Sequence, residues 1–209
     1  MRVRTEAKRA EILDTAASVF LEQGFERASM SEIAGRVGGS KGTLYGYFKS
    51  KEELFIAVVM AESDKQLAPL FDELDRQPAN LRDALIFIGE RAIAYLLTPD
   101  AIAALRMVVS EAHRSDIGQR YFERGRHRGI QAMAAYLEAA RKAGRLQPCN
   151  FEIAAGHLIS LMESEWLPSV LFGLARPAPS RREIRESMQR AVDVFLAAYG
   201  AHDKARRGN

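Results

Sequence analysis

The chain has 209 residues, a hydrophobic content of 47% and a net charge of +3, all of it gathered in residues 1–51. This composition is ordinary for a globular protein with a sizeable core, and the chain offers no uninterrupted run of about 18 apolar residues that could span a membrane. The charged start, MRVRTEAKRAEIL, lacks a signal peptide's apolar segment, and the single cysteine, Cys149, excludes an internal disulfide and a multi-thiolate zinc site. We therefore expect a cytoplasmic protein with no membrane partner.

Three helices are predicted in the first 48 residues, because apolar positions recur there with the helical period. The first helix carries an apolar stripe and stops at a glycine: Ile12, Leu13, Ala16, Ala17, Phe20 and Gly24. Ser29 and Glu32 have the spacing of a capping box, which predicts a second short helix over about 30–37. Ser40 follows two glycines and caps a third helix, over about 41–48.

The rest of the chain continues the helical period, and no segment shows a convincing period-2 strand pattern. The predicted helices are, in chain order, 50–77, 81–96, 99–114, 117–143, 153–172 and 183–199. The helix at 153–172 is apolar on more than one face, which indicates burial on two sides, and Pro168 is expected to kink it. The polar residues 201–209 are expected to form a disordered tail.

The stretch GGSKGTLYGYFKSK, residues 38–51, has the glycines, hydroxyls and lysines that suit a phosphate. A nucleotide-binding P-loop requires G-x-x-x-x-G-K-[ST] after a buried strand, whereas here Lys41 precedes Gly42 and the preceding segment is helical. Short second and third helices joined by a glycine turn instead match a helix-turn-helix, whose last helix enters the major groove of DNA. The sequence therefore favours a phosphate of the DNA backbone.

Residues 26–54, ERASMSEIAGRVGGSKGTLYGYFKSKEEL, resemble the N-terminal DNA-binding domain of the TetR/AcrR family of bacterial transcriptional regulators. The matching residues are Gly24-Phe25, Ser29-Met30, Ile33-Ala34, Gly38, Ser40 to Tyr45, Tyr47-Phe48 and Lys51 to Leu54. The resemblance implies an all-α protein with a helix-turn-helix domain at 1–51 and a helical ligand-binding and dimerisation domain at 52–200. The segment from Met107 to His127 resembles the C-terminal half of efflux-pump repressors in this family.

The motif also suggests which residues touch DNA: Ser29, Ser40, Lys41, Gly42, Thr43, Tyr45, Tyr47 and Lys51. Short hydroxyl side chains near a helix N-terminus suit a phosphate, and Lys41 can reach a phosphate or a guanine edge. Gly42 lets the backbone approach the groove, and Tyr45 offers a hydroxyl or a ring. Tyr47 is expected to donate to a phosphate, and the resemblance implies that Lys51 clamps the DNA backbone.

Other positions near the motif have different expected roles. Leu44 and Phe48 are expected in the core, whereas Arg2 and Arg4 form either an arm along DNA or a solvated end. Two glycines depart from the family pattern: Gly39 replaces a small packing residue, and Gly46 lies inside the recognition helix, where glycine costs about 1 kcal/mol. Both predict a recognition helix that orders fully only on DNA.

The C-terminal part carries no catalytic motif such as H-E-x-x-H or G-x-S-x-G and no cluster of metal ligands, so we expect neither an enzyme nor a cofactor. Four glutamates lie within apolar helices: Glu90, Glu111, Glu163 and Glu165. They either face solvent or pair with arginines such as Arg91, Arg106 and Arg114, or one or two of them line a cavity for a cationic ligand. The resemblance implies a small-molecule pocket, for which the candidates, equally suited to ordinary core, are Phe87, Tyr95, Met107, Glu111, Met162 and Trp166.

The helices at 153–172 and 183–199 carry more apolar surface than the edge of a monomer needs, and the family uses such a pair as a four-helix dimer interface. The resulting expectation is a ligand-released repressor that binds a near-palindromic DNA operator as a homodimer. A transcriptional activator and a non-specific architectural DNA-binding protein remain alternatives.

Overall fold

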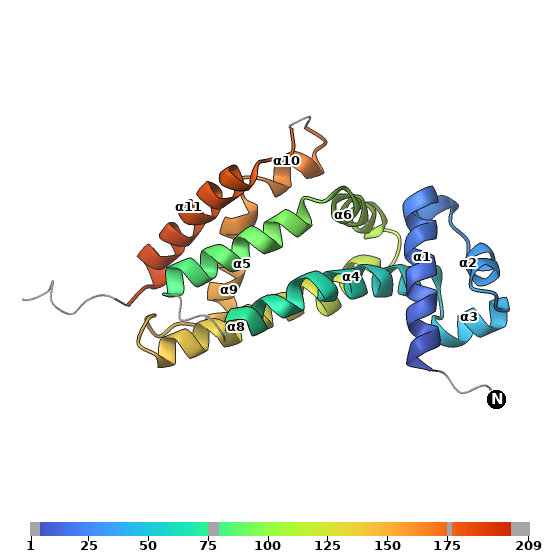
Figure 1. Cartoon of the computed structure of the whole chain (residues 1–209), viewed down its shortest axis with the longest axis horizontal. Helices are drawn as coiled ribbons and strands as arrows, with labels where there is room; N and C mark the ends of the chain where they lie inside the picture. Colours follow the sequence, from blue (N-terminus) through green and yellow to red (C-terminus); the bar gives the residue numbers. More distant parts are fainter. Residues whose placement is uncertain (1–4, 75–79, 175–176, 202–209) are drawn as a thin grey trace, which may run out of the picture. The chain divides into compact units, whose positions relative to one another are not determined.

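In the computed structural model, residues 5–74, 80–174 and 177–201 are described, and all named elements within these ranges are helices (Figure 1). They are α1 (Glu6–Arg27), α2 (Met30–Arg36), α3 (Lys41–Tyr47), α4 (Lys51–Leu74), α5 (Leu81–Leu96), α6 (Pro99–Glu111), α7 (Ile117–Tyr121), the π-helix η1 (Phe122–Arg126), α8 (His127–Lys142), α9 (Phe151–Glu163), α10 (Leu167–Leu171) and α11 (Arg181–Tyr199). The predicted all-α class is confirmed. Arg2, Arg4, the expected helix end near Gln77 and residues 202–209 of the expected tail lie outside the described residues.

The described helices form two compact units. The first unit comprises residues 5–65 and 103–125, and the second comprises residues 66–74, 80–102, 126–174 and 177–201. The first unit therefore contains α1, α2 and α3, the three helices predicted in the first 48 residues. It also contains the start of α4, most of α6, and α7. The functional division at residue 51, with DNA binding before it and ligand binding after it, stays a prediction.

The core of the first unit is built on three aromatic rings, from Phe20, Phe25 and Phe55. Their ring centroids lie 5.2 to 6.0 Å apart, in edge-on and stacked arrangements that favour aromatic packing. Val108 of α6 and Ile117 of α7 belong to the same buried cluster, with exposed fractions of 4% and 0%. Helices distant in sequence thus complete the hydrophobic core beneath the helix-turn-helix.

Gly24, predicted as the end of the first helix, instead lies at a kink within α1. Its φ of +77° is a left-handed conformation that glycine adopts without strain, and helical geometry resumes for one further turn up to Arg27. The backbone N–H of Ala28 closes this turn by donating to the carbonyl of Gly24 at 3.3 Å. The kink redirects the chain from α1 into α2.

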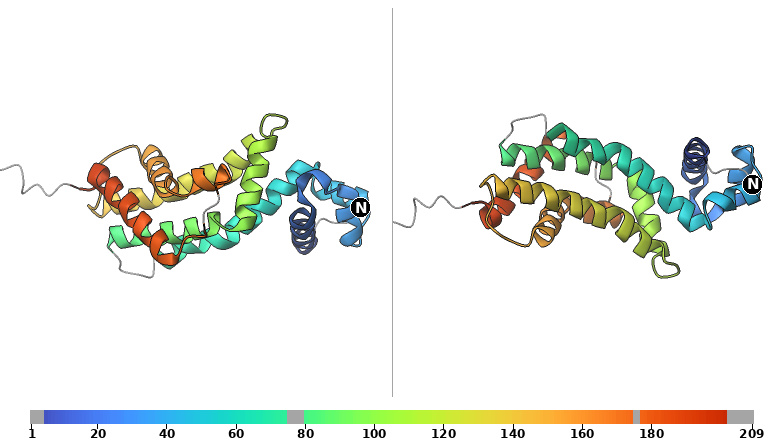
Figure 2. Two further views of the ribbon diagram at one scale, coloured as in Figure 1. Left: turned by 90° about the horizontal axis from the view of Figure 1, so that it is seen from above. Right: turned by 90° about the horizontal axis from the view of Figure 1, so that it is seen from below.

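In the second unit, α9 packs against α8 and α11, and α11 packs along α5 (Figure 2). The predicted apolar stripe of α11 is buried: Ile184, Met188, Ala191, Val192 and Phe195. Gly89 explains the close approach of α5, because a Cβ at this position would lie 2.6 Å from the Met188 sulfur and 3.1 Å from Cε of Met162. A side chain there would have to displace these two methionine side chains.

The helix predicted over 117–143 runs without a gap from Ile117 to Lys142, but its middle, η1, has π geometry, which was not predicted. The wider π turn brings Gly125 against Met60, and a Cβ on this glycine would lie only 2.8 Å from the methionine Cε. Tertiary packing of this kind leaves no mark in the apolar period of the segment. The helix end at Gly144 is confirmed by a φ of +76°.

The kink predicted at Pro168 was wrong, because the segment forms two helices. α9 ends at Glu163, and α10 begins at Leu167 after a turn. Pro168 lies in the first turn of α10, where the missing backbone N–H of proline costs no hydrogen bond. The proline therefore starts a helix here and does not bend one.

Candidate DNA-binding surface

The predicted caps place α2 and α3 as a helix-turn-helix. The Ser29 hydroxyl accepts from the backbone N–H of Glu32 at 3.2 Å, and the Ser40 hydroxyl accepts from that of Thr43 at 3.0 Å. Between the two helices, Gly38 has a φ of +67°, a conformation that favours glycine. Each cap satisfies a backbone donor that the start of the helix leaves free, so the sequence fixes both starting points.

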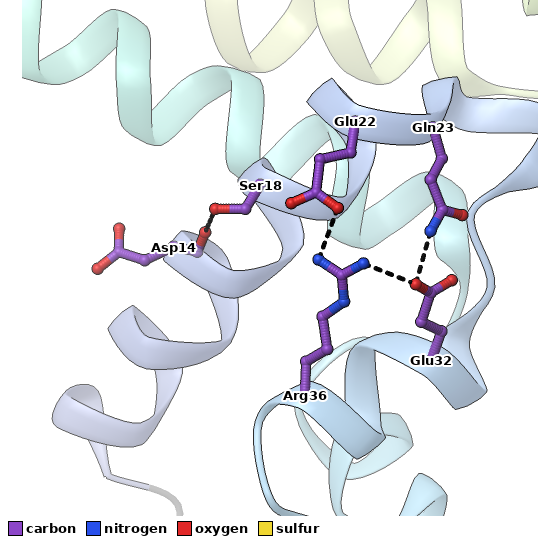
Figure 3. A network of polar contacts seen from close by, with 6 residues as sticks. All are labelled: Asp14, Ser18, Glu22, Gln23, Glu32 and Arg36. Atoms are coloured by element: carbon purple, nitrogen blue, oxygen red, sulfur yellow. Dashed lines mark hydrogen bonds and ion pairs between the residues drawn. The ribbon is translucent and has the colours of Figure 1, made fainter.

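The second half of the capping box predicted at Glu32 is replaced by a polar network between α1 and α2 (Figure 3). The carboxylate of Glu32 accepts from the Gln23 amide at 2.6 Å and from the Arg36 guanidinium at 3.0 Å, while Arg36 also donates to Glu22 at 2.8 Å. These carboxylates raise the pKa of Arg36, the hydrogen bond to Glu22 contributing most. Glu32 thus makes two side-chain hydrogen bonds, one of them to the Arg36 cation, in place of the single bond that a capping box would give it. The spacing of these residues along the chain does not predict this network.

Leu44 and the C-cap residue Phe48 hold the recognition helix α3 on the core, while Lys41, Gly42 and Tyr45 lie exposed. Leu44 and Phe48 are buried, with exposed fractions of 2% and 3%, as predicted. Lys41 and Gly42 are exposed, and Tyr45 is 42% exposed. The Lys41 ammonium lies 5.9 Å from the centre of the Tyr45 ring, within the range of a cation–π contact. The outer side of α3 thus combines a cation, an aromatic ring and bare backbone.

Three glycine positions of this segment are not required by packing in the free protein. A Cβ at Gly46 would meet nothing within 4 Å, one at Gly42 would lie 3.7 Å from the Ser40 hydroxyl, and one at Gly39 would lie 4.0 Å from Cβ of Thr43. Both distances are ordinary van der Waals contacts, and the position at Gly46 is open. Gly39 therefore leaves a small gap rather than a strained turn, and the close approach of DNA remains the predicted role of Gly42.

Hydroxyl groups lie at both ends of α3. Those of Ser40 and Thr43 are 3.0 Å apart at its start, where the predicted phosphate contacts fall. At its end, the Tyr47 hydroxyl accepts from the backbone N–H of Thr5 at 3.0 Å, and the Thr5 side chain caps α1. Tyr47 therefore already has one partner within the protein.

Lys51 lies differently from what the family resemblance implies. Its ammonium donates to the backbone carbonyls of Phe25, Glu26 and Ala28 at 2.7, 3.2 and 3.2 Å. It also lies 4.3 Å from the centre of the Phe25 ring. In the free protein this cation is held inside the first unit, and its predicted contact with the DNA backbone stays a prediction.

The six residues predicted to line an effector pocket fall into both units. Phe87, Met162 and Trp166 come together in the core of the second unit, and the Trp166 indole N–H donates to the buried hydroxyl of Ser187 at 2.7 Å. Tyr95 lies half-buried on α5 in the same unit, whereas Met107 packs on the core of the first unit and Glu111 ends α6 there. The pocket itself stays a prediction.

The four glutamates of the apolar helices each have an arginine within 4.0 Å. The pairs are Glu163 with Arg126 at 2.8 Å, Glu165 with Arg190 at 2.6 Å, Glu90 with Arg185 at 3.5 Å and Glu111 with Arg114 at 4.0 Å. Pairing with arginines was one of the predicted alternatives. Of the partners named there, only Arg114 is among these four arginines. The other partners come from helices that are remote in sequence, which local spacing does not reveal.

Apolar side chains remain exposed on the two helices expected to form a dimer interface. Ile153 of α9 is 55% exposed and Val194 of α11 is 56% exposed. Beside them, Nδ1 of His157 and the hydroxyl of Tyr199 lie 2.6 Å apart and join α9 to α11. These helices are therefore fixed to one another, while the dimer stays a prediction.

Among residues 5–74, 80–174 and 177–201, no group of three or more His, Cys, Asp or Glu side chains could hold a metal ion. No single helix in the same ranges is long and apolar enough to cross a membrane, although α5 and α6, bent by 74° at their junction, meet the criteria of length and composition as a pair.

Comparisons with known families match both parts of the chain. Residues 12–58 match the bacterial regulatory proteins of the tetR family, and residues 83–201 match the C-terminal domain of AefR-like transcriptional repressors. The predicted likeness of the C-terminal half to efflux-pump repressors is not what this second match describes, and it stays a prediction.

Individual relatives agree with these matches. YfiR of Bacillus subtilis, an uncharacterised helix-turn-helix transcriptional regulator, is 26% identical over 68% of this chain and 70% of its own length. FasR of Mycolicibacterium smegmatis, a transcriptional activator, is 41% identical, but the match covers only 30% of this chain and 29% of FasR. The likeness to FasR therefore extends over less than a third of either protein.

Solved structures resemble nearly the whole chain. A TetR family transcriptional regulator from Pseudomonas syringae pv. tomato has a TM-score of 0.62 at 29% identity, covering 96% of this chain and all of its own. The flavonoid-responsive regulator FrrA has a TM-score of 0.70 at 27% identity, covering 95% of this chain and all of its own. The fold of both units is thus shared with regulators of known structure.

Proposed function

Because this chain belongs to the TetR family of DNA-binding transcriptional regulators, a non-enzymatic family, we propose that it is a repressor that binds a near-palindromic operator as a homodimer and is released by a small molecule. The observation that carries the proposal is the outer side of α3, where Lys41 and Tyr45 are exposed while Leu44 holds the helix on the core. A helix-turn-helix uses the first residues of such a helix to contact base edges in the major groove.

Specific contacts follow from the chemistry of this side. Lys41 and Tyr45 read bases, since an ammonium can donate to guanine and a tyrosine ring can contact a thymine methyl. Gly42 lets the backbone of α3 approach the groove. Phosphate contacts come from the hydroxyl groups around the helix-turn-helix: Ser29, Ser40, Thr43 and Tyr47.

Dimerisation through α9 and α11 is supported by the apolar side chains that these helices leave exposed, Ile153 and Val194. Two-fold symmetry makes the same patch face itself in both subunits, and α9 and α11 of each subunit then form a four-helix bundle. Two recognition helices related by this axis read the same half-site in opposite directions, about one turn of DNA apart. The operator is therefore near-palindromic.

Release by a ligand follows from thermodynamic linkage. A small molecule that prefers a dimer with badly spaced recognition helices weakens DNA binding by the same factor by which DNA weakens its own binding. Candidates to contact it in the second unit are Phe87, Tyr95, Met162 and Trp166. The AefR-like repressor match supports repression, and FrrA, described as flavonoid-responsive, supports control by a small molecule. FasR, an activator, supports the alternative of activation.

The test begins with enrichment of a pool of random duplexes on the wild-type protein. We expect an inverted repeat, bound by two chains, and lower expression from a reporter that carries this repeat over its promoter. A flavonoid is the first probe of release from the enriched duplex. Higher reporter expression would support the activator, and a pool without any enriched sequence would support the architectural protein.

A further inference from the structure

Lys51 opens α4 and holds its ammonium against the segment that links α1 to α2. Nζ donates to the carbonyl oxygens of Phe25, Glu26 and Ala28, and lies over the Phe25 ring at 4.3 Å. Carbonyls at the end of a helix lack partners within that helix and need donors from elsewhere. Here one ammonium donates hydrogen bonds to three carbonyls, and the Phe25 ring below it adds a cation–π contact.

We infer that Lys51 is a positioning residue for the DNA-binding surface and does not clamp a phosphate, an inference that rests on the proposed function. A lysine ammonium has three N–H donors, and here all three have carbonyl acceptors within the protein. Turning it toward DNA would leave these carbonyls without their donor, which offsets the gain from a phosphate.

The place of Lys51 in the chain explains what it positions. Ala28, whose carbonyl it binds, immediately precedes Ser29, the cap of α2, so the ammonium holds the entry to the helix-turn-helix. Lys51 itself begins the helix that follows α3, so it also fixes the exit. Next to it, the Ser50 hydroxyl accepts from the N–H of Glu53 at 3.1 Å, which caps α4.

The α3–α4 link carries a second restraint of the same kind. The Glu53 carboxylate accepts from the backbone N–H of Lys49 at 2.8 Å. Entry and exit of the α2–α3 pair are thus tied to a single helix start. Loss of the Lys51 ammonium frees the entry alone and lets the recognition helix tilt, which disturbs base contacts more than phosphate contacts, because base contacts need the stricter geometry.

Salt dependence separates the two roles. Each phosphate that a protein cation neutralises contributes about 0.9 to the slope of log affinity against log salt concentration. A phosphate clamp therefore contributes to the slope on any DNA sequence, whereas a positioning residue contributes to the preference for the operator. A variant that is only less stable has a smaller folded fraction, which weakens its binding to every duplex equally. Its preference for the operator therefore stays unchanged.

The experiment compares wild-type protein, Lys51→Met and the control Lys65→Met on the enriched operator and on a scrambled duplex, over a series of salt concentrations. Lys65 is a lysine of the same helix whose side chain is 61% exposed, so its variant makes the same charge change on the surface. For Lys51→Met we expect operator binding weakened about tenfold, scrambled binding within about twofold and an unchanged slope. The control should match wild type in all three.

Two results would overturn the inference. One is equal weakening on both duplexes by Lys51→Met together with a slope lowered by about 0.9, the mark of a phosphate contact. The other is operator binding that does not change at all. A wild-type protein that prefers no duplex would instead contradict the proposed function, and the inference with it.

Lys51→Arg gives the answer even if the methionine variant does not fold. Arginine keeps the charge, but its planar, forked donors cannot converge on three carbonyls as a single ammonium does. A positioning role predicts a lower preference for the operator, with the slope retained. A phosphate clamp predicts wild-type affinity for both duplexes, because arginine binds phosphate at least as well, and that result would also contradict the inference.

Discussion

The hydroxyl oxygen of Tyr47 accepts a hydrogen bond from the backbone N–H of Thr5 at 3.0 Å, across 42 positions of the sequence. Tyr47 is the last residue of α3, and Thr5 is the cap of α1, so this bond joins the end of the recognition helix to the start of the first helix. Because the hydroxyl acts as the acceptor, its own proton remains available to a phosphate oxygen. One side chain can thus hold α3 in place and contact DNA.

Replacement of Tyr47 by phenylalanine removes both functions of its hydroxyl. We expect the free energy of unfolding to fall by about 1 kcal/mol, the typical net value of one hydrogen bond, and operator affinity to fall about fivefold. Urea unfolding and titration of the operator duplex measure the two effects. Tyr45→Phe is the control for stability, because Tyr45 is 42% exposed and lies on the outer side of α3. If Tyr47→Phe unfolds like wild type, the bond to Thr5 does not contribute.

Replacement of Gly46 by alanine should stabilise the free protein by about 1 kcal/mol, because glycine inside a helix is entropically costly. A Cβ there meets nothing within 4 Å, so no contact opposes the gain. Since a better-ordered α3 needs less ordering on DNA, operator affinity should stay equal or rise. Thermal unfolding and duplex titration test both parts, and a lower melting temperature would count against the prediction.

Gly42→Ala is the matched substitution on the same helix, with the opposite expected effect on DNA binding. Its Cβ would lie 3.7 Å from the Ser40 hydroxyl, an ordinary contact, so the free protein should lose no stability. The added methyl group lies where the backbone is proposed to approach the groove, and operator affinity should fall about tenfold. Unchanged affinity would show that DNA does not come close to Gly42.

Val194→Asp tests the proposed dimer interface, because it places a charge on an exposed apolar position of α11. Wild-type protein is expected to scatter light as two chains of 23.3 kDa, and the variant as one. The control is Leu21→Asp, which changes a residue that is 64% exposed on α1, outside the proposed interface. A wild-type mass of one chain at working concentration would contradict the dimer.

Acid should weaken the second unit through carboxylates that are paired with arginines on other helices. Hydrogen bonding to Arg82 lowers the pKa of Asp193, and hydrogen bonding to Arg190 lowers that of Glu165. A carboxyl group whose pKa is lower in the folded state stabilises the fold above its unfolded pKa, about 4, and this stabilisation disappears as the pH falls through the folded pKa. Urea unfolding between about pH 6 and pH 3 should show the loss.

Arg82→Met and Arg190→Met are the variants that test this origin. Each should flatten the decrease in unfolding free energy over the acidic range, since the partner carboxylate then titrates near its ordinary pKa in both states. Arg182→Met is the matched control, because Arg182 pairs with Glu186 on α11 itself and does not join two helices. An acid profile like that of wild type in both test variants would assign the effect to other groups.

Local chemistry made much of the fold predictable from the sequence. Ser29 and Ser40 each cap a helix by accepting a backbone N–H three residues ahead, a short-range rule that needs no tertiary information. The apolar stripe of α11 likewise follows from the helical period alone. The exposed side of α3 was predictable because Leu44 and Phe48 define its buried side.

Contacts between distant segments were not predictable in this way. Val108 and Ile117 complete the core of the helix-turn-helix, although their own segments read as part of another domain. The ammonium of Lys51 binds carbonyls more than twenty residues away, so that its charge alone suggested a DNA contact. The turn of η1 depends on packing against Met60, which has no counterpart in the apolar period.

The most direct test of sequence-specific DNA binding through α3 is titration of the DNA upstream of the protein's own gene, and of a scrambled duplex of equal length, with wild type and Tyr45→Ala at two salt concentrations. We expect wild type to prefer the upstream DNA at both salt concentrations, and Tyr45→Ala to lose most of that preference while melting normally. Equal, salt-sensitive binding of wild type to both duplexes, or a preference untouched in Tyr45→Ala, would contradict it.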